Sequence, residues 1–194
     1  VPGVELDIHL CKSGELVVTH DFELERITGY HGTVEETDFE TLRSLDAGAW
    51  FGEEYRGEKI PLLEEVFDLL GTHVYYDIEI KSSGKDPSPL EERLAETIRR
   101  GGYEQRVLVS SFNPFALRNF SRAAPEVATA VIYTNHPDIP PLLRHGEGRF
   151  IAKPTALKPD RTKITPCSLF LHTKIEGYPI IVWTEDEPEG ARRL

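Results

Sequence analysis

The sequence predicts an α/β fold, and three observations favour a closed TIM (β/α)8 barrel. Predicted strands and helices alternate from residue 74 onward, which is typical of a parallel sheet covered by helices. Two strands are predicted at residues 4–10 and 74–81. Every second position in them is apolar, and most of the positions in between carry charged residues. Strands in a buried parallel sheet are normally apolar on both faces. A barrel explains the charged face, because polar residues point inward at the carboxyl ends of its strands.

The polar faces of these two strands predict a metal site. The first strand carries Glu5 and Asp7 on that face, and the second carries Glu79 and Lys81. If the two faces meet, three carboxylates crowd together, and their mutual repulsion requires a cation among them. The competing interpretation is a pair of antiparallel strands with one face in water, which would alternate in the same way.

The first third of the chain predicts a strand, a loop and two helices. Residues 15–19 form a strand that ends at His20 and Asp21, and residues 22–37 form a polar loop over the site. Asp38 is the expected N-cap of a short helix that closes near Gly48. A second helix starts at Pro61 and covers residues 62–70.

The remaining chain continues the alternation. Further strands are expected at residues 107–111, 128–133, 150–152 and 179–183, and helices at 89–100, 114–124, 168–176 and from 188 onward. Residues 154–165 are rich in Lys, Pro and Thr and show no periodicity. They are left without an assigned element.

Composition excludes several classes of function. The 22 basic and 33 acidic residues give a net charge of −11, which disfavours nucleic acid and anionic membrane surfaces. Cys11 and Cys167 match no zinc spacing and no disulfide framework. No apolar run approaches the ~20 residues of a membrane span, and no signal peptide is visible. We expect one cytoplasmic domain over residues 1–194, with a loop-rich insertion at about 22–60 and no stable membrane insertion.

Eight short segments, taken in order, resemble the glycerophosphodiester phosphodiesterase family. The resemblance implies a TIM barrel that hydrolyses small glycerophosphodiesters to glycerol 3-phosphate and an alcohol with the help of a divalent cation. Each segment is short, but together they keep the family's order across nearly the whole chain. The segments are Glu5–Asp7, Gly14–Asp21, Leu24–Gly29, Leu45–Gly48, Ile60–Val66, Ile78–Lys81, Ser110–Phe112 and Val182–Thr184.

The resemblance also assigns roles to individual residues. Glu5, Asp7 and Glu79 are implied to be the metal ligands. Carboxylates without a cysteine ligand favour a hard cation, so Mg²⁺ or Ca²⁺ is expected. The resemblance implies that His20 is one of two catalytic histidines, which exchanges a proton with an ester oxygen, and that Lys81 acts beside it. The implied substrate-binding residues are Arg26 near the phosphate and Phe112 and Trp183 near the glycerol.

The sequence departs from the family pattern at both ends. The His-Arg-Gly motif of the first barrel strand and the final Gly-rich strand are absent, so six of eight family strands are expected and the polypeptide is expected to continue beyond residues 1 and 194. The absent first histidine leaves open an inactive barrel that only binds ligand. A phospholipase-like relative that acts on lipid head groups is a further alternative, but no apolar membrane-docking loop is evident in the sequence.

Overall fold

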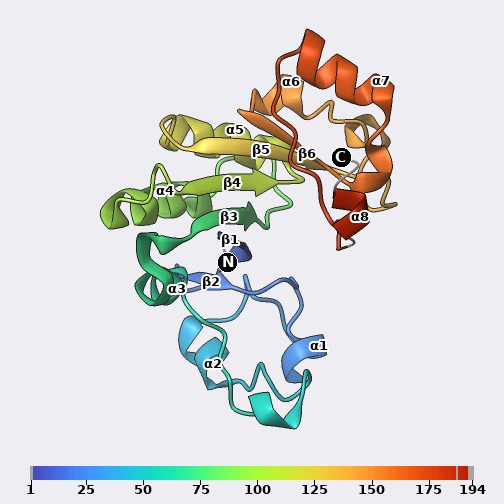
Figure 1. Cartoon of the computed structure of the whole chain (residues 1–194). Coiled ribbons are helices and arrows are strands. Elements are labelled where there is room, and N and C mark those ends of the chain that lie inside the picture. The colour runs from blue at the N-terminus through green and yellow to red at the C-terminus, as the bar shows by residue number, and fades with distance from the viewer. Residues whose placement is uncertain (1, 187, 192–194) are drawn as a thin grey trace.

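A six-stranded, mostly parallel sheet organises the molecule. The computed structural model describes residues 2–186 and 188–191. The strand order is β2-β1-β3-β4-β5-β6, and β2 alone runs antiparallel to its neighbour. Figure 1 shows the sheet as a curved wall, with residues 22–60 extending away from it at the β2 side. The strands are β1 (Gly3–Leu10), β2 (Leu16–Val18), β3 (Tyr75–Ile80), β4 (Val107–Ser111), β5 (Ala128–Tyr133) and β6 (Ala156–Pro159).

Helices separate the parallel strands, as in a barrel. The two long ones, α4 and α5, follow β3 and β4, contact each other and pack near the sheet (Figure 1). The α-helices are α1 (Glu25–Thr28), α2 (Phe39–Ser44), α3 (Leu63–Leu70), α4 (Pro89–Gly101), α5 (Pro114–Ala123), α6 (Arg149–Ala152), α7 (Pro166–Leu169) and α8 (Pro188–Ala191). Short 3-10 turns lie at residues 53–55, 71–73, 141–143 and 161–163, and a π-helical stretch, Phe170–Ile175, continues α7. No described helix is long and apolar enough to cross a membrane.

Helix α4 shows how local sequence fixes these elements. Ser88 caps it by accepting a hydrogen bond from the Leu90 N–H, and the Glu91 carboxylate accepts one from the Ser88 backbone N–H. Gly102 ends the helix in the left-handed conformation, with φ 72°. The face of α4 that includes Leu94 is buried against the outer face of the sheet. The inner face of the sheet therefore remains available for the site.

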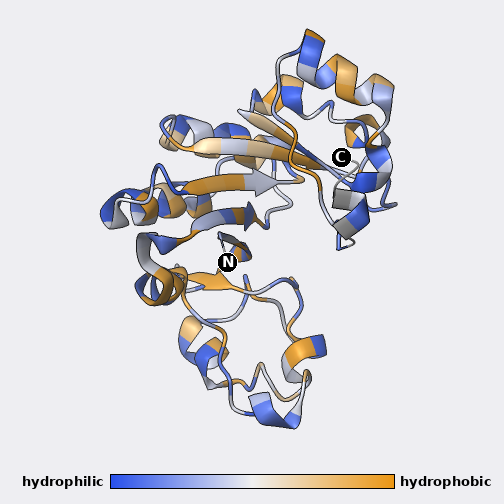
Figure 2. Cartoon of the chain, in the orientation of Figure 1, coloured by the Kyte–Doolittle hydropathy of each residue, from blue (hydrophilic) through white to orange (hydrophobic). Residues whose placement is uncertain are grey.

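The buried apolar side chains of the described residues form two hydrophobic cores. The larger core lies between the sheet and the helices and includes Ile78, Leu94 and Phe120. Figure 2 shows β2, β4 and β5 coloured as hydrophobic over most of their length. The second core joins residues 22–60 to the start of the chain and consists of Cys11, Val17, Leu24, Ile27, Val34, Leu42 and Ile60. We therefore propose that residues 22–60 form an insertion on a single barrel domain, as the sequence predicted.

Several elements differ from the sequence-based expectation. Residues 150–152 are helical, because their N–H groups bond back to residues 147 and 148. Residues 156–159 form β6, which the sequence left unassigned. The helix after Asp38 ends at Ser44, and α3 begins at Leu63, two residues beyond Pro61. The expected strand at 179–183 pairs with β6 only through the parallel bridges Leu157–Ile180 and Asp160–Trp183.

Candidate active site

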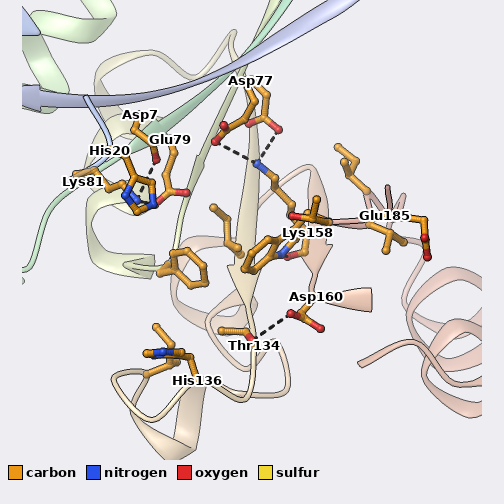
Figure 3. A pocket seen from close by; sticks show the side chains of 18 of the residues that line it. Asp7, His20, Asp77, Glu79, Lys81, Thr134, His136, Lys158, Asp160 and Glu185 are labelled. Atoms are coloured by element: carbon orange, nitrogen blue, oxygen red, sulfur yellow. Dashed lines mark hydrogen bonds and ion pairs between the residues drawn. The ribbon is translucent and has the colours of Figure 1, made fainter. Parts of the chain in front are cut away.

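A cavity of about 840 Å³ opens at the carboxyl ends of the parallel strands. Barrel enzymes place their active sites at this end, because the strand ends and their loops converge there. Figure 3 shows charged side chains from several strands pointing into the cavity. The residues that line it are Glu5, Asp7, His20, Asp77, Glu79, Lys81, Phe112, Ile132, Thr134, His136, Asp138, Ile139, Lys158, Asp160, Ile181, Val182, Trp183, Thr184 and Glu185.

Glu5, Asp7 and Glu79 converge in this cavity, as the sequence predicted. The parallel register of β1 and β3 places Asp7 directly opposite Glu79. One carboxylate oxygen from each of the three residues lies within 4.8 Å of the other two. Three carboxylates and no thiolate form a donor set that suits a hard divalent cation.

The electrostatics of this cluster favour a bound cation. Burial, followed by the neighbouring Asp7 charge, raises the pKa of Glu5 to about 7. Burial also raises the pKa of Glu79, although Lys81 counteracts it. Raised pKa values mean that the ionised carboxylates are unfavourable without a positive partner. A divalent cation in contact with all three would supply that partner.

Lys81 neutralises part of the cluster. Its Nζ lies 2.9 Å from Asp7 Oδ1 and 2.9 Å from Glu79 Oε1, and the side chain is largely buried. Burial alone would lower the pKa of Lys81, but Glu79 and Asp7 outweigh it and raise the pKa. Lys81 therefore stays charged at the edge of the carboxylate cluster.

Lys158 is a second buried cation, which sequence reasoning missed. Its Nζ lies 2.8 Å from Asp77 Oδ2 and 4.0 Å from Glu5 Oε1 (Figure 3). Ser110 also contacts the pair, because its hydroxyl donates to Asp77 Oδ1 at 2.7 Å and lies 3.4 Å from Lys158 Nζ. The available signal was a lysine within the short, otherwise apolar segment Ala156–Pro159.

His20 lines the cavity from the end of β2. The N–H of Thr19 donates to the Asp7 carbonyl at 3.0 Å, which places His20 beside the carboxylate cluster. Its ring Nδ1 lies 2.7 Å from Asp21 Oδ1. His9, to which the sequence assigns no role, is fully buried on β1 and packs edge-on against Phe22. Burial lowers the pKa of His9 to about 4.

Arg26, which the resemblance places near the phosphate, contacts residues outside the cavity lining. It is not among the described residues that line the cavity. Its Nε donates to Asp21 Oδ2 at 2.5 Å, and its guanidinium carbon lies 4.6 Å from the centroid of the Trp50 ring. Arg26 thus pairs with Asp21, and its expected place near the phosphate stays a prediction.

Phe112 and Trp183 meet in the cavity as an aromatic pair. Their ring centroids lie 5.6 Å apart, with the planes nearly perpendicular. The indole N–H of Trp183 donates to the Lys158 carbonyl at 3.0 Å, which fixes the ring at the β6 side. Sequence reasoning missed the polar residues of the neighbouring loops, whose positions depend on long-range packing: Thr134, His136, Asp138, Asp160 and Glu185.

A cavity lined by carboxylates and lysines at the carboxyl ends of a parallel sheet is the arrangement of a barrel enzyme. All 194 residues match the sequence profile of the glycerophosphoryl diester phosphodiesterase family. The chain therefore belongs to this family of enzymes, and the fold and the class of reaction that the sequence predicted are confirmed.

Individual relatives agree with this assignment. The chain is 35% identical over 193 residues to a glycerophosphodiester phosphodiesterase of Caldanaerobacter subterraneus subsp. tengcongensis, covering 99% of this chain and 77% of the relative. It is 39% identical over 132 residues to one from Bacillus altitudinis, covering 67% of this chain and 54% of that relative.

Solved structures show the same fold. A putative glycerophosphoryl diester phosphodiesterase from Silicibacter pomeroyi matches with a TM-score of 0.80 at 25% identity. An Oleispira antarctica phosphodiesterase in complex with the product sn-glycerol-3-phosphate matches with a TM-score of 0.78 at 26% identity. Each match covers 100% of this chain and 76% of the solved chain.

Proposed function

We propose that this chain hydrolyses small glycerophosphodiesters to glycerol 3-phosphate and an alcohol, with a Mg²⁺ or Ca²⁺ ion held by Glu5, Asp7 and Glu79. The observation that carries the proposal is the convergence of these three carboxylates beside His20 in a family member. The product bound to the Oleispira relative supports the same substrate class. The cation, when bound, would polarise the phosphoryl oxygens and offset the negative charge that develops on them.

His20 is the proposed proton-transfer residue. The contact of its Nδ1 with Asp21 favours the tautomer in which Nδ1 carries the hydrogen. Nε2 then exchanges a proton with an ester oxygen of the substrate. Lys81 is the second proposed catalytic residue, since its ammonium lies at the carboxylate cluster where the phosphate must bind.

The aromatic pair is proposed to bind the glycerol moiety. Phe112 and Trp183 present apolar surface on the cavity wall, which suits the carbon backbone of a triol. Lys158, whose carbonyl accepts from the Trp183 indole, reaches toward Glu5 with its ammonium. The cavity therefore offers an ionic end for the phosphate and an aromatic wall for the rest of the substrate.

Chelation and two substitutions test this function. Removal of divalent ions should abolish release of glycerol phosphate, and Mg²⁺ or Ca²⁺ should restore it. His20→Ala should lower kcat by about 10²–10⁴-fold with little change in KM. Glu79→Gln should weaken metal binding in calorimetry. His31→Ala is the matched control, because this exposed histidine lies in the insertion and pairs with Glu25. Full activity after exhaustive chelation, checked by metal analysis, would refute the metal assignment.

One observation favours a second candidate, hydrolysis of lipid head groups. The insertion exposes an aromatic cluster of Trp50, Phe51 and Tyr55, whose neighbouring rings lie 5.6 and 5.1 Å apart. Exposed aromatic clusters of this kind mark interaction surfaces. Turnover of a lysophospholipid above its micellar concentration, compared with a water-soluble diester, distinguishes the two. A preference for the micellar substrate that Phe51→Ser removes would support the second candidate.

A further inference from the structure

A continuous set of contacts connects His20 to the insertion. Asp21 accepts from His20 Nδ1 through Oδ1 at 2.7 Å and from Arg26 Nε through Oδ2 at 2.5 Å. The Arg26 guanidinium lies over the Trp50 ring, and the Trp50 indole N–H donates to the Ala47 carbonyl at 2.9 Å. Each oxygen of Asp21 thus has a different partner, one in the cavity and one in the insertion.

His20 needs such support more than the other residues of the site. Its side chain is 70% exposed and follows a strand of only three residues, whereas the Asp21 side chain is only 20% exposed. An exposed side chain samples several rotamers, and this lowers the fraction of time that it spends in a reactive position. The largely buried carboxylate of Asp21, which contacts Nδ1, is placed to restrict both the rotamer and the tautomer of the ring.

We propose that Asp21 is the positioning residue of His20, and that Arg26 and Trp50 hold Asp21 in place from the insertion. This inference rests on the proposed role of His20 in proton transfer. An aspartate that orients a catalytic imidazole through Nδ1–H is a recurrent arrangement in enzymes, because it leaves Nε2 free to face the substrate. Here the support extends one step further, to a cation and an aromatic ring outside the cavity.

The identity of Arg26 matters to this arrangement. A planar guanidinium donates to a carboxylate in its plane while its face lies against an indole ring. A lysine ammonium is a compact charge without a planar face, so it cannot make both contacts with the same geometry. Arg26 and Trp50 therefore act as one unit.

Three variants of the intact protein test the inference, with steady-state kinetics as the first readout. Asp21→Asn should lower kcat by about tenfold or more, and at most by the ~10²–10⁴-fold that general acid–base catalysis contributes, while KM stays within about twofold. Arg26→Met should change kcat in the same direction by a smaller factor, and Arg26→Lys should not restore it. Arg56→Met is the matched control, because it removes an exposed pair with Glu53 in the same insertion. It should leave kcat unchanged.

The second readout is the tautomer of His20, measured by nitrogen NMR of the imidazole. The wild-type ring should carry its hydrogen on Nδ1, and Asp21→Asn and Arg26→Met should give a mixture. A merely structural role of Asp21 would change stability without this mixture.

The outcomes separate the inference from the function beneath it. If Asp21→Asn keeps the wild-type kcat and the wild-type His20 tautomer, and His20→Ala has lost activity, the inference is overturned and the role of His20 stands. Wild-type kcat in His20→Ala would instead overturn the proposed role of His20. Arg26 is half-exposed, so Arg26→Met decides the matter if Asp21→Asn does not fold. Wild-type values in Arg26→Met would then count against the inference.

Discussion

At the scale of single residues, two buried lysines each form ion pairs with different carboxylates of the cavity. Lys81 pairs with Asp7 and Glu79, and Lys158 pairs with Asp77 and approaches Glu5. A buried ion pair contributes little net stability, but removal of one partner leaves an uncompensated charge that is strongly destabilising. Removal of either lysine should therefore destabilise the protein more than removal of a residue from an exposed surface ion pair.

Lys158→Met should reduce the free energy of unfolding by about 3 kcal/mol, since Asp77 then lacks its cation. The double variant Lys158→Met with Asp77→Asn should recover part of that loss. Lys12→Met is the control, because Lys12 and Asp38 form an exposed pair whose loss costs about 0.5 kcal/mol. Urea unfolding measures all of these. Equal costs for Lys12→Met and Lys158→Met would contradict the argument.

The raised pKa of Glu5 predicts a pH dependence of the metal-free protein. Between about pH 4.5 and about 7, the folded state holds a proton on Glu5 that the unfolded state has released, so this group's contribution to stability falls as pH rises. His9 has the opposite effect between about pH 4 and 6.5, because its folded pKa is lowered by burial.

The difference between wild type and Glu5→Gln isolates the contribution of Glu5. We expect the free energy of unfolding of the wild type minus that of Glu5→Gln to decrease from pH 5 to pH 7. Urea unfolding in the presence of a chelator measures both values. A difference that stays constant over this range would show that Glu5 ionises normally in the folded protein.

At the scale of elements, long elements were predictable from the sequence and short ones were not. The strands at 107–111 and 128–133 match the expectation, and α4 and α5 differ from it by one residue at their ends. These elements span several periods of an apolar pattern. β6 has four residues and ends in Pro159, so no period can be recognised.

The same contrast holds for the site. The period-two alternation predicted that Glu5 and Asp7 share one face of their strand and that Glu79 and Lys81 share one face of theirs. The structure places all four side chains together. Lys158 was missed because its strand was missed. The pairing of Arg26 with Asp21 depends on the turn after β2 and on Trp50, which no local pattern encodes.

The Ser88 cap gives a test at this scale. Ser88→Ala should lower the free energy of unfolding by about 1 kcal/mol, because the Leu90 N–H at the start of α4 loses its acceptor. Ser83→Ala, in the exposed loop before the cap, should have an effect near zero. Chemical denaturation of both variants checks this, and equal stabilities would show that the capping bond contributes nothing.

At the scale of the whole molecule, the proposed metal site connects β1 with β3. Any ligand that binds only the folded state raises its stability, by about 2.7 kcal/mol at a concentration 100 times its Kd. A cation that joins Glu5 and Asp7 to Glu79 would therefore stabilise the sheet as well as the reaction.

Thermal unfolding with increasing Mg²⁺ or Ca²⁺ should show a rising midpoint in the wild type and a much smaller rise in Glu79→Gln. The same titration with Glu54→Gln, an acidic residue of the insertion outside the cavity, should follow the wild type. An identical rise in all three proteins would place the stabilising ion elsewhere.

The alignment of β1 and β3 has a consequence for how the chain reaches its fold. Glu5 lies opposite Asp77, and Asp7 lies opposite Glu79. A slip of one residue in β3 would turn Ile78 into the cavity and press the charges of Asp77 and Glu79 against the apolar helices. A misaligned pair of strands is therefore less stable than the native pair. The carboxylates of the cavity thus also favour one alignment of the neighbouring strands β1 and β3.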